Sequence, residues 1–106
     1  MAKYLYEGCY TEQGLKGLMK EGGSSRRQVV EAMLKELGGK LEAFYYAFGD
    51  NDVYCIVDVP DHVTTAAVIF AVNASGAAKL KTTVLLTPED VDQATKKSVH
   101  YRPPAK

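Results

Sequence analysis

The chain lacks an excess of charge of either sign. Its 106 residues include 13 Lys and Arg against 13 Asp and Glu, so the formal net charge is zero. Proteins that bind nucleic acid usually carry surplus basic side chains that neutralise phosphates. The balanced charge therefore argues against nucleic acid as a partner.

Long apolar runs are also missing. No stretch approaches the roughly 18 apolar residues that a membrane-spanning helix needs. Residues 1–3 lead directly into a strand-like pattern rather than into the apolar centre of a signal peptide. We therefore expect a cytoplasmic protein without a membrane partner.

Cysteine and histidine are scarce. Cys9 and Cys55 are too few for a disulfide framework and belong to no C-x-x-C pair, so buried thiols are expected, although neighbouring strands could bring the two close together. Neither His62 nor His100 has a partner at metal-ligand spacing, so no metal site is predicted. The glycine-rich segment 20–25 lacks the order of a phosphate-binding loop and is interpreted as a flexible connection, which leaves no cofactor motif.

The composition is that of one globular domain. Hydrophobic residues make up 46% and charged residues 25% of the chain, both ordinary values for a soluble fold. No linker or internal repeat is visible. We expect a single domain over residues 1–98 followed by a tail over residues 99–106.

The segment 38–61 predicts a β-hairpin. Residues 40–48 are rich in aromatic side chains and residues 53–59 in β-branched ones, both typical of strands. Between them, Gly49 and Asn51 tolerate the backbone angles of a tight turn. In the first of these strands, simple alternation places Leu41 on the same face as Tyr45.

Six further elements follow from periodicity and capping signals. A strand is expected before the hairpin, and a helical start directly follows that strand. The four glycines of residues 14–23 argue against a firm helix in that segment. After the hairpin, an almost wholly apolar helix should be covered on more than one side. The expected elements are a strand at 3–10, a helical start at Glu12, a helix from Ser25 to Gly38, a helix at 62–75, a strand at 79–86 and a short helix opening at Thr87 and Pro88.

This order predicts an α+β, ferredoxin-like βαββαβ fold: a four-stranded antiparallel sheet with both helices on one face. The strands carry apolar or aromatic side chains on both faces, yet the helices can cover only one. Monomers rarely expose more than a few hundred Å² of contiguous apolar surface. We therefore expect a homodimer in which two sheets pack face to face as a dimeric α/β barrel. The alternative to a dimer is a partly polar exposed face, made tolerable by tyrosine hydroxyls that reach solvent.

Four acidic residues are candidates for a functional role. Glu7 and Asp58 are isolated charges in apolar strands, and burial of Glu7 would make it a candidate general base. A solvated position at the strand end is the alternative for both. Asp52 is a second catalytic candidate, with turn formation as the alternative. Asp61 is placed to cap the following helix.

The tyrosines are the best material for a ligand site. A phenol packs flat against a planar ligand while its hydroxyl orients it, and we single out Tyr6, Tyr45 and Tyr54 as ligand-binding candidates. Aromatic side chains are also enriched at subunit interfaces, so a tyrosine-rich dimer interface is the alternative. Six of the seven tyrosines lie on three strands that should be neighbours: Tyr4, Tyr6, Tyr10, Tyr45, Tyr46 and Tyr54.

Several segments together resemble the GYD-domain family: residues 10–14, 38–41, 44–49 and 56–61, with Asp52. They are spread over most of residues 3–90. The family pattern has a tyrosine directly before the aspartate, where this chain has Asn51. The resemblance implies a dimeric α/β barrel, within a group that includes small-molecule-binding modules, cofactor-free oxygenases and isomerases. It provides no catalytic residues to carry over.

Three functions remain open. A homodimeric small-molecule-binding module predicts a cavity lined by Tyr6, Tyr45 or Tyr54. It predicts no acid or base with a strongly shifted pKa. A cofactor-free isomerase or monooxygenase acting on a small aromatic or carbonyl compound predicts Glu7 or Asp52 buried beside that cavity. A structural module predicts a filled barrel without a pocket. The fold alone does not choose among them.

Overall fold

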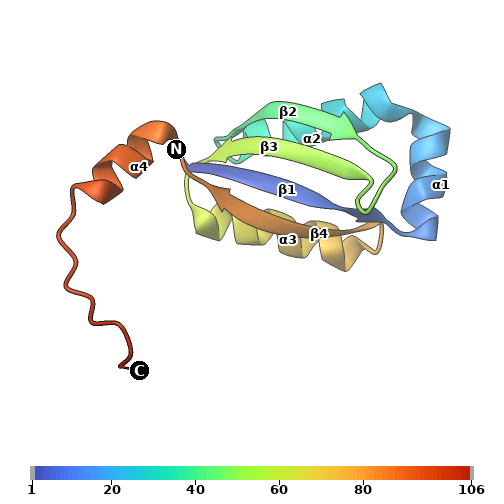
Figure 1. The fold of residues 1–106 in the computed structure, drawn as a ribbon. Coiled ribbons are helices and arrows are strands. Elements are labelled where there is room, and N and C mark those ends of the chain that lie inside the picture. The colour runs from blue at the N-terminus through green and yellow to red at the C-terminus, as the bar shows by residue number, and fades with distance from the viewer. Residues whose placement is uncertain (1, 106) are drawn as a thin grey trace.

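A computed structural model of the protein describes residues 2–105. Within them the chain forms eight elements, which Figure 1 shows as a sheet with flanking helices. They are β1 (Ala2–Tyr10), α1 (Glu12–Glu21), α2 (Gly23–Glu36), β2 (Lys40–Tyr46), β3 (Val53–Val59), α3 (His62–Ser75), β4 (Ala78–Leu85) and α4 (Pro88–Thr95).

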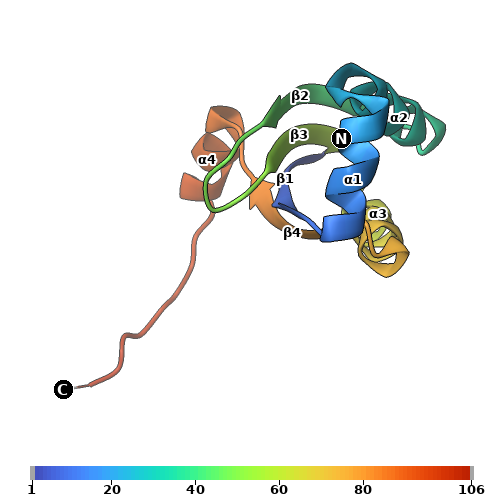
Figure 2. The same cartoon turned by 90° about the vertical axis from the view of Figure 1, so that its right-hand side faces the viewer.

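The four strands form one antiparallel sheet in the order β2-β3-β1-β4. Helices α2 and α3 lie on the same face, α2 against β2 and α3 against β4, and the opposite face is bare in the single chain (Figure 2). This arrangement confirms the predicted α+β, ferredoxin-like fold.

Alternation along the two central strands separates the faces of the sheet. In β3, Val53, Cys55, Val57 and Val59 are buried, and the residues between them are only partly covered. Their partners on β1 include Tyr4 and Tyr6, which are 4% and 3% exposed. We call the side bearing these residues the helix face. The open face carries Leu5, Glu7 and Cys9 of β1, Tyr54, Ile56 and Asp58 of β3, Tyr45 of β2 and Lys79 and Lys81 of β4.

A bulge in β2 corrects one prediction. Leu41 pairs with Val57 and Phe44 with Cys55, so Leu41 and Phe44 share the helix face. Glu42 is the extra residue between them, because the register shifts between Leu41 and Ala43. A bulge places two residues opposite one and reverses the alternation beyond it. Leu41 and Tyr45 therefore lie on opposite faces rather than on the same one.

The glycine-rich segment is helical, which corrects the prediction of a flexible connection at 20–25. Helix α1 runs to Glu21, α2 begins at Gly23, and only Gly22 separates them, with a φ of 89°. Thr11 caps α1 by accepting the backbone N–H of Gly14 at 3.1 Å. A cap and tertiary contacts here outweigh the low helix propensity of glycine.

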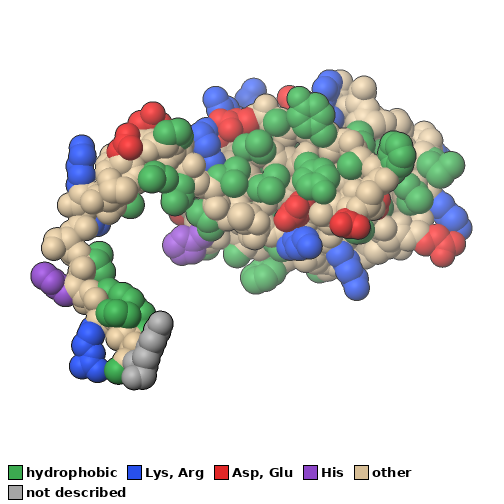
Figure 3. Space-filling model, viewed as in Figure 1, with side chains coloured by type: hydrophobic (Ala, Val, Ile, Leu, Met, Phe, Trp, Pro, Cys, Tyr) green, Lys and Arg blue, Asp and Glu red, His purple; other side chains and the backbone are tan. Residues whose placement is uncertain are grey.

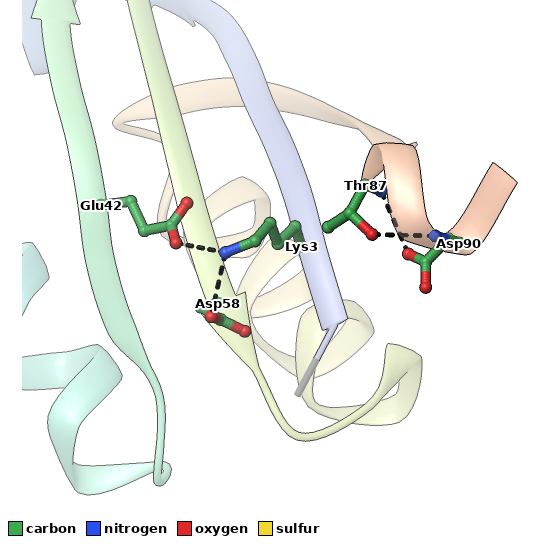
Figure 4. A network of polar contacts seen from close by, with 5 residues as sticks. All are labelled: Lys3, Glu42, Asp58, Thr87 and Asp90. Carbon is green, nitrogen blue, oxygen red and sulfur yellow. Dashed lines mark hydrogen bonds and ion pairs between the residues drawn. The ribbon is translucent and has the colours of Figure 1, made fainter. Parts of the chain in front are cut away.

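Two predicted caps are confirmed. The carboxylate of Asp61 accepts the backbone N–H of Thr64 at 2.9 Å and opens α3. Thr87 and Asp90 form a reciprocal capping box at the start of α4 (Figure 4). The Thr64 hydrogen bonds also hold the pKa of Asp61 below its ordinary value.

Helix α3 is covered on one side only in the single chain, contrary to the prediction. Thr65 and Val68 are buried against the sheet, whereas Val63 and Phe70 are 68% and 71% exposed. Between residues 2 and 105, no helix is long and apolar enough to cross a membrane.

Two glycines of α1 provide a matched test of its packing. A Cβ at Gly14 would lie 1.8 Å from the carbonyl oxygen of Ala77, whereas a Cβ at Gly17 meets nothing within 4 Å. We expect Gly14→Ala to lower the free energy of unfolding by about 1–3 kcal/mol through overpacking. Gly17→Ala should raise it by up to about 1 kcal/mol through helix propensity. Urea denaturation measures both, and equal effects would contradict the close contact between α1 and the α3–β4 connection.

Candidate functional site

A cavity of about 270 Å³ lies between the helix face of the sheet and the two helices that cover it. Its sheet side is formed by residues of all four strands, including Tyr6, Cys55, Phe44 and Leu80. Because α2 and α3 cover different parts of the sheet (Figure 2), neither helix fills the space between them.

The walls of the cavity are mostly apolar. Val30 and Met33 of α2 line one side and Val68, Ala71 and Val72 of α3 the other. On the sheet side Tyr6, Val53, Cys55 and Ala78 are all buried. A concave apolar space with a few polar groups is the usual form of a small-molecule site.

The polar groups of the cavity gather where α2 begins. Tyr10 and Arg26 line it there, and Arg26 carries the only charge among the lining residues. Nearby, the hydroxyl of Tyr46 donates to the backbone carbonyl of Gly23 at 3.0 Å. Burial, with a smaller contribution from Tyr46, raises the pKa of Tyr10 to about 12, and the positive charge of Arg26 opposes this rise.

Two residues on the sheet side of the cavity, Tyr6 and Cys55, also carry polar groups. The hydroxyls of Tyr6 and Thr65 are 3.0 Å apart and buried, so each satisfies the other. The thiol of Cys55 is desolvated, and burial raises its pKa to about 12. A thiol with this pKa remains protonated at neutral pH and is a poor nucleophile.

The chemistry that this lining offers is recognition. The residues around the cavity provide phenol and hydroxyl groups, one guanidinium and a protonated thiol, but no carboxylate or imidazole. General base catalysis at neutral pH requires a group that is deprotonated there. The cavity can therefore enclose and orient a small molecule more readily than it can remove a proton from it.

The structure separates the three predicted ligand-binding tyrosines. Tyr6 lies on the helix face and lines the cavity, whereas Tyr45 and Tyr54 are cross-strand partners on the open face. Successive side chains of a strand point to opposite faces, so the sheet itself stands between them. Within one chain, Tyr6 and the other two cannot contact the same ligand.

Glu7, a predicted catalytic candidate, lies on the open face and away from the cavity. The side-chain amide of Asn51 donates to the Glu7 carboxylate at 3.4 Å and to the Tyr54 hydroxyl at 3.3 Å. Lys81 is the cross-strand neighbour of Glu7. Asn51 thus links two of the predicted site residues, Glu7 and Tyr54.

Asp52, the other catalytic candidate, joins the β2–β3 turn to β1. Its carboxylate accepts the backbone N–H of Tyr10 at 2.9 Å, and its own N–H donates to the carbonyl of Gly8 at 2.8 Å. Asp52 is not among the residues that line the cavity. These hydrogen bonds attach the β2–β3 turn to the backbone of β1, so the role of Asp52 is structural and not confined to the turn.

Asp58 belongs to a charged network at one end of the open face (Figure 4). Lys3 contacts Glu42 and also Asp58, the latter at 3.2 Å, and both carboxylates raise the pKa of Lys3. Among the described residues, the second carboxylate oxygen of Asp58 is buried without a hydrogen-bond partner.

The two cysteines lie on opposite faces of the sheet. Cys55 is buried, as predicted, but Cys9 is exposed on the open face and donates to the carbonyl of Asp50 at 3.2 Å. They therefore cannot form a redox pair. Within residues 2–105, no three His, Cys, Asp or Glu side chains come together in a way that could hold a metal ion.

Sequence reasoning missed the contribution of α2 and α3 to the site. Arg26 follows a capping signal, where a basic residue looks like ordinary helix surface. Ala71 is one of several small residues in an apolar helix. The spacing of Arg26, Val30 and Met33, at intervals of three and four residues, is the signal that places them on one helical side.

The four-stranded antiparallel sheet, with two helices on one face and an apolar cavity beneath them, defines a ferredoxin-like α+β domain. Residues 4–95 match the family model of the GYD domain. The match spans most of the chain, so the protein belongs to the GYD domain family, as the sequence resemblance predicted. Comparison with curated proteins and with solved structures gives no significant match.

Substitutions in the Tyr6–Thr65 pair test the buried hydrogen bond beside the cavity. Tyr6→Phe leaves the buried Thr65 hydroxyl without its partner, and we expect a loss of about 1–2 kcal/mol in the free energy of unfolding. Thr65→Val removes the other hydroxyl and keeps the side-chain shape. The double variant should lose less than the sum of the two single variants. Additive losses in urea denaturation would contradict a direct hydrogen bond.

Proposed function

We propose that the protein is a homodimeric module that binds a small, largely apolar molecule in the cavity between its sheet and its helices. The observation that carries this proposal is the cavity itself: about 270 Å³ with nearly continuous apolar walls. An apolar cavity of about 150 Å³ already accepts benzene, and sites for drug-sized ligands begin near roughly 300 Å³. The volume therefore suits a molecule of one or two rings.

The polar end of the cavity narrows the ligand class further. Arg26, whose guanidinium also lies 3.6 Å from the Glu21 carboxylate, and the phenol Tyr10 line the same end of a mostly apolar space. A guanidinium is a strong donor toward carboxylate and other anionic oxygens. The ligand that fits best is an aromatic or alicyclic molecule with one acidic or carbonyl oxygen directed toward Arg26.

The enzyme and assembly hypotheses receive less support. The enzyme hypothesis required Glu7 or Asp52 beside the cavity, but Glu7 lies on the open face and Asp52 holds the backbone of Tyr10. The assembly hypothesis required a filled barrel without a pocket, whereas a pocket lies between the sheet and its helices. Binding without catalysis accounts for both observations.

The open face supports the homodimer. Leu5 and Ile56 are cross-strand partners there, as are Tyr45 and Tyr54. Hydrophobic side chains gather over the strands on this face (Figure 3). In this proposal Tyr45 and Tyr54 contribute to the dimer interface and Tyr6 to the ligand site, which agrees with the enrichment of aromatic residues at interfaces.

A cavity-filling substitution tests the ligand site. Ala71 and Ala67 are both exposed residues of α3, but only Ala71 lines the cavity. We expect Ala71→Leu to weaken binding of the probes toluene and 4-methylbenzoate by about tenfold or more, with Ala67→Leu unchanged. Arg26→Gln should weaken only 4-methylbenzoate, again by about tenfold, because toluene has no anionic group.

Amide chemical-shift titration measures probe binding, and mass spectrometry under native and denaturing conditions detects any molecule retained from purification. Thiol labelling supplies an internal control, since a bound probe should slow modification of Cys55 in the cavity and not of Cys9 on the other face of the sheet. Equal probe binding by the Ala71→Leu and Ala67→Leu variants would rule out this cavity as the site.

A pair of equally exposed aromatic residues tests the dimer. Tyr45 on the open face and Phe70 on the outer side of α3 are both 71% exposed in the single chain. We expect Tyr45→Asp to convert the dimer into monomers, because an unpaired charge would be buried between the sheets. Phe70→Asp should remain dimeric by light scattering. The opposite result would place the interface on α3 instead.

A further inference from the structure

Helix α4 is a well-formed element without a surface to pack on in its own chain. Its capping box is complete, Pro88 stands in the first turn, and Glu89 and Asp90 favour the helix dipole. None of its side chains is buried, and Val91 is 46% exposed. An isolated helix of eight residues is unstable in water even with good caps.

The position of α4 shows which side its docking surface lies on. The helix and the segment after it project away from the sheet on the side of the open face (Figures 1 and 2). They extend the chain to 55 × 35 × 22 Å, with a radius of gyration of 17.0 Å. A compact domain of this length has a radius of about 13 Å. The family match runs to residue 95, the last residue of α4, so the helix is part of the domain.

Charge complementarity points to the surface that receives it. Glu89 and Asp92 are exposed acidic residues on α4, and Asp90 is occupied by the cap. On the open face, Lys79 and Lys81 are exposed along the edge strand β4. Among the described residues, neither lysine forms an ion pair, although Lys81 lies across from Glu7.

We propose that α4 of each protomer docks on the second copy of the chain, at the edge of the partner's open face, with Glu89 and Asp92 facing the partner's Lys79 and Lys81. This inference rests on the homodimer of the proposed function and adds a reciprocal arm to it. Docking of α4 on the partner covers Val91 and extends the interface beyond the two sheets. It also places an opposite charge beside each exposed edge strand, where unpaired backbone groups invite unwanted pairing.

Charge reversal on the full-length chain tests the arm. The arm variant carries Glu89→Lys and Asp92→Lys, and the edge variant carries Lys79→Glu and Lys81→Glu. Each should weaken its own homodimer by about tenfold or more, because like charges then meet at both ends of the dimer. Sedimentation under reducing conditions measures the dissociation constant and keeps the exposed Cys9 from cross-linking.

Mixing the two variants gives the decisive result. A heterodimer pairs the basic arm with the acidic edge and the acidic arm with the basic edge, so both contacts become attractive. We expect native mass spectrometry to show the heterodimer in clear excess over both homodimers. A statistical mixture would overturn docking in trans, because a helix docked on its own chain gains nothing from mixing.

A matched apolar substitution separates the arm from the sheet contact. Val91→Asp on α4 should weaken the dimer, and Val63→Asp, the same change on the exposed side of α3, should not. If the unaltered protein is a monomer at micromolar concentration, the homodimer itself is refuted and the arm with it. If the protein is a dimer that the arm, edge and Val91 variants leave intact, only the arm is refuted.

Discussion

The pairing of β1 with β3 is the constraint on which the rest of the structure depends. These central strands place Tyr4, Tyr6, Val57 and Val59 on one face and Leu5 and Ile56 on the other, so both faces of the sheet are apolar at its centre. A ferredoxin-like connection brings both crossover helices to the same face. One apolar face is thereby covered within the chain, and the other needs cover from outside it.

The covered face leads to the cavity. Helices α2 and α3 pack against opposite edge strands, and small residues such as Ala71 of α3 and Ala78 of β4 are among those that line the space between them. The remaining volume is mostly apolar, and its one charged group, Arg26, lies where α2 begins. The spacing of two helices on one sheet therefore creates the cavity, and the start of α2 places its charged group at one end.

The open face has a different chemistry. Its apolar centre is flanked by the Lys3, Glu42 and Asp58 network at one end and by the Glu7, Asn51 and Tyr54 cluster nearer the other. Polar groups at the margin of an apolar patch are typical of protein interfaces. Asn51 therefore lies on the side of the sheet proposed for assembly, and the proposed ligand site lies on the other side. In this proposal the two tasks are separated by the thickness of one sheet.

Sequence by itself determined the elements whose signals are local. Alternation in residues 53–59, the caps at Asp61 and Thr87 and the order of strands and helices were enough for the fold. Tertiary structure decided what depends on contacts between distant residues. The bulge at Glu42 placed Leu41 and Tyr45 on opposite faces. The close approach of Ala77 leaves no room for a side chain at Gly14, although that glycine lies in a helix. The candidate site divided in the same way: Tyr6 was foreseeable as a lining residue, but its separation from Tyr45 and Tyr54 and the approach of Arg26 were not. Local patterns specify backbone conformation, whereas a cavity exists only between elements that the chain brings together.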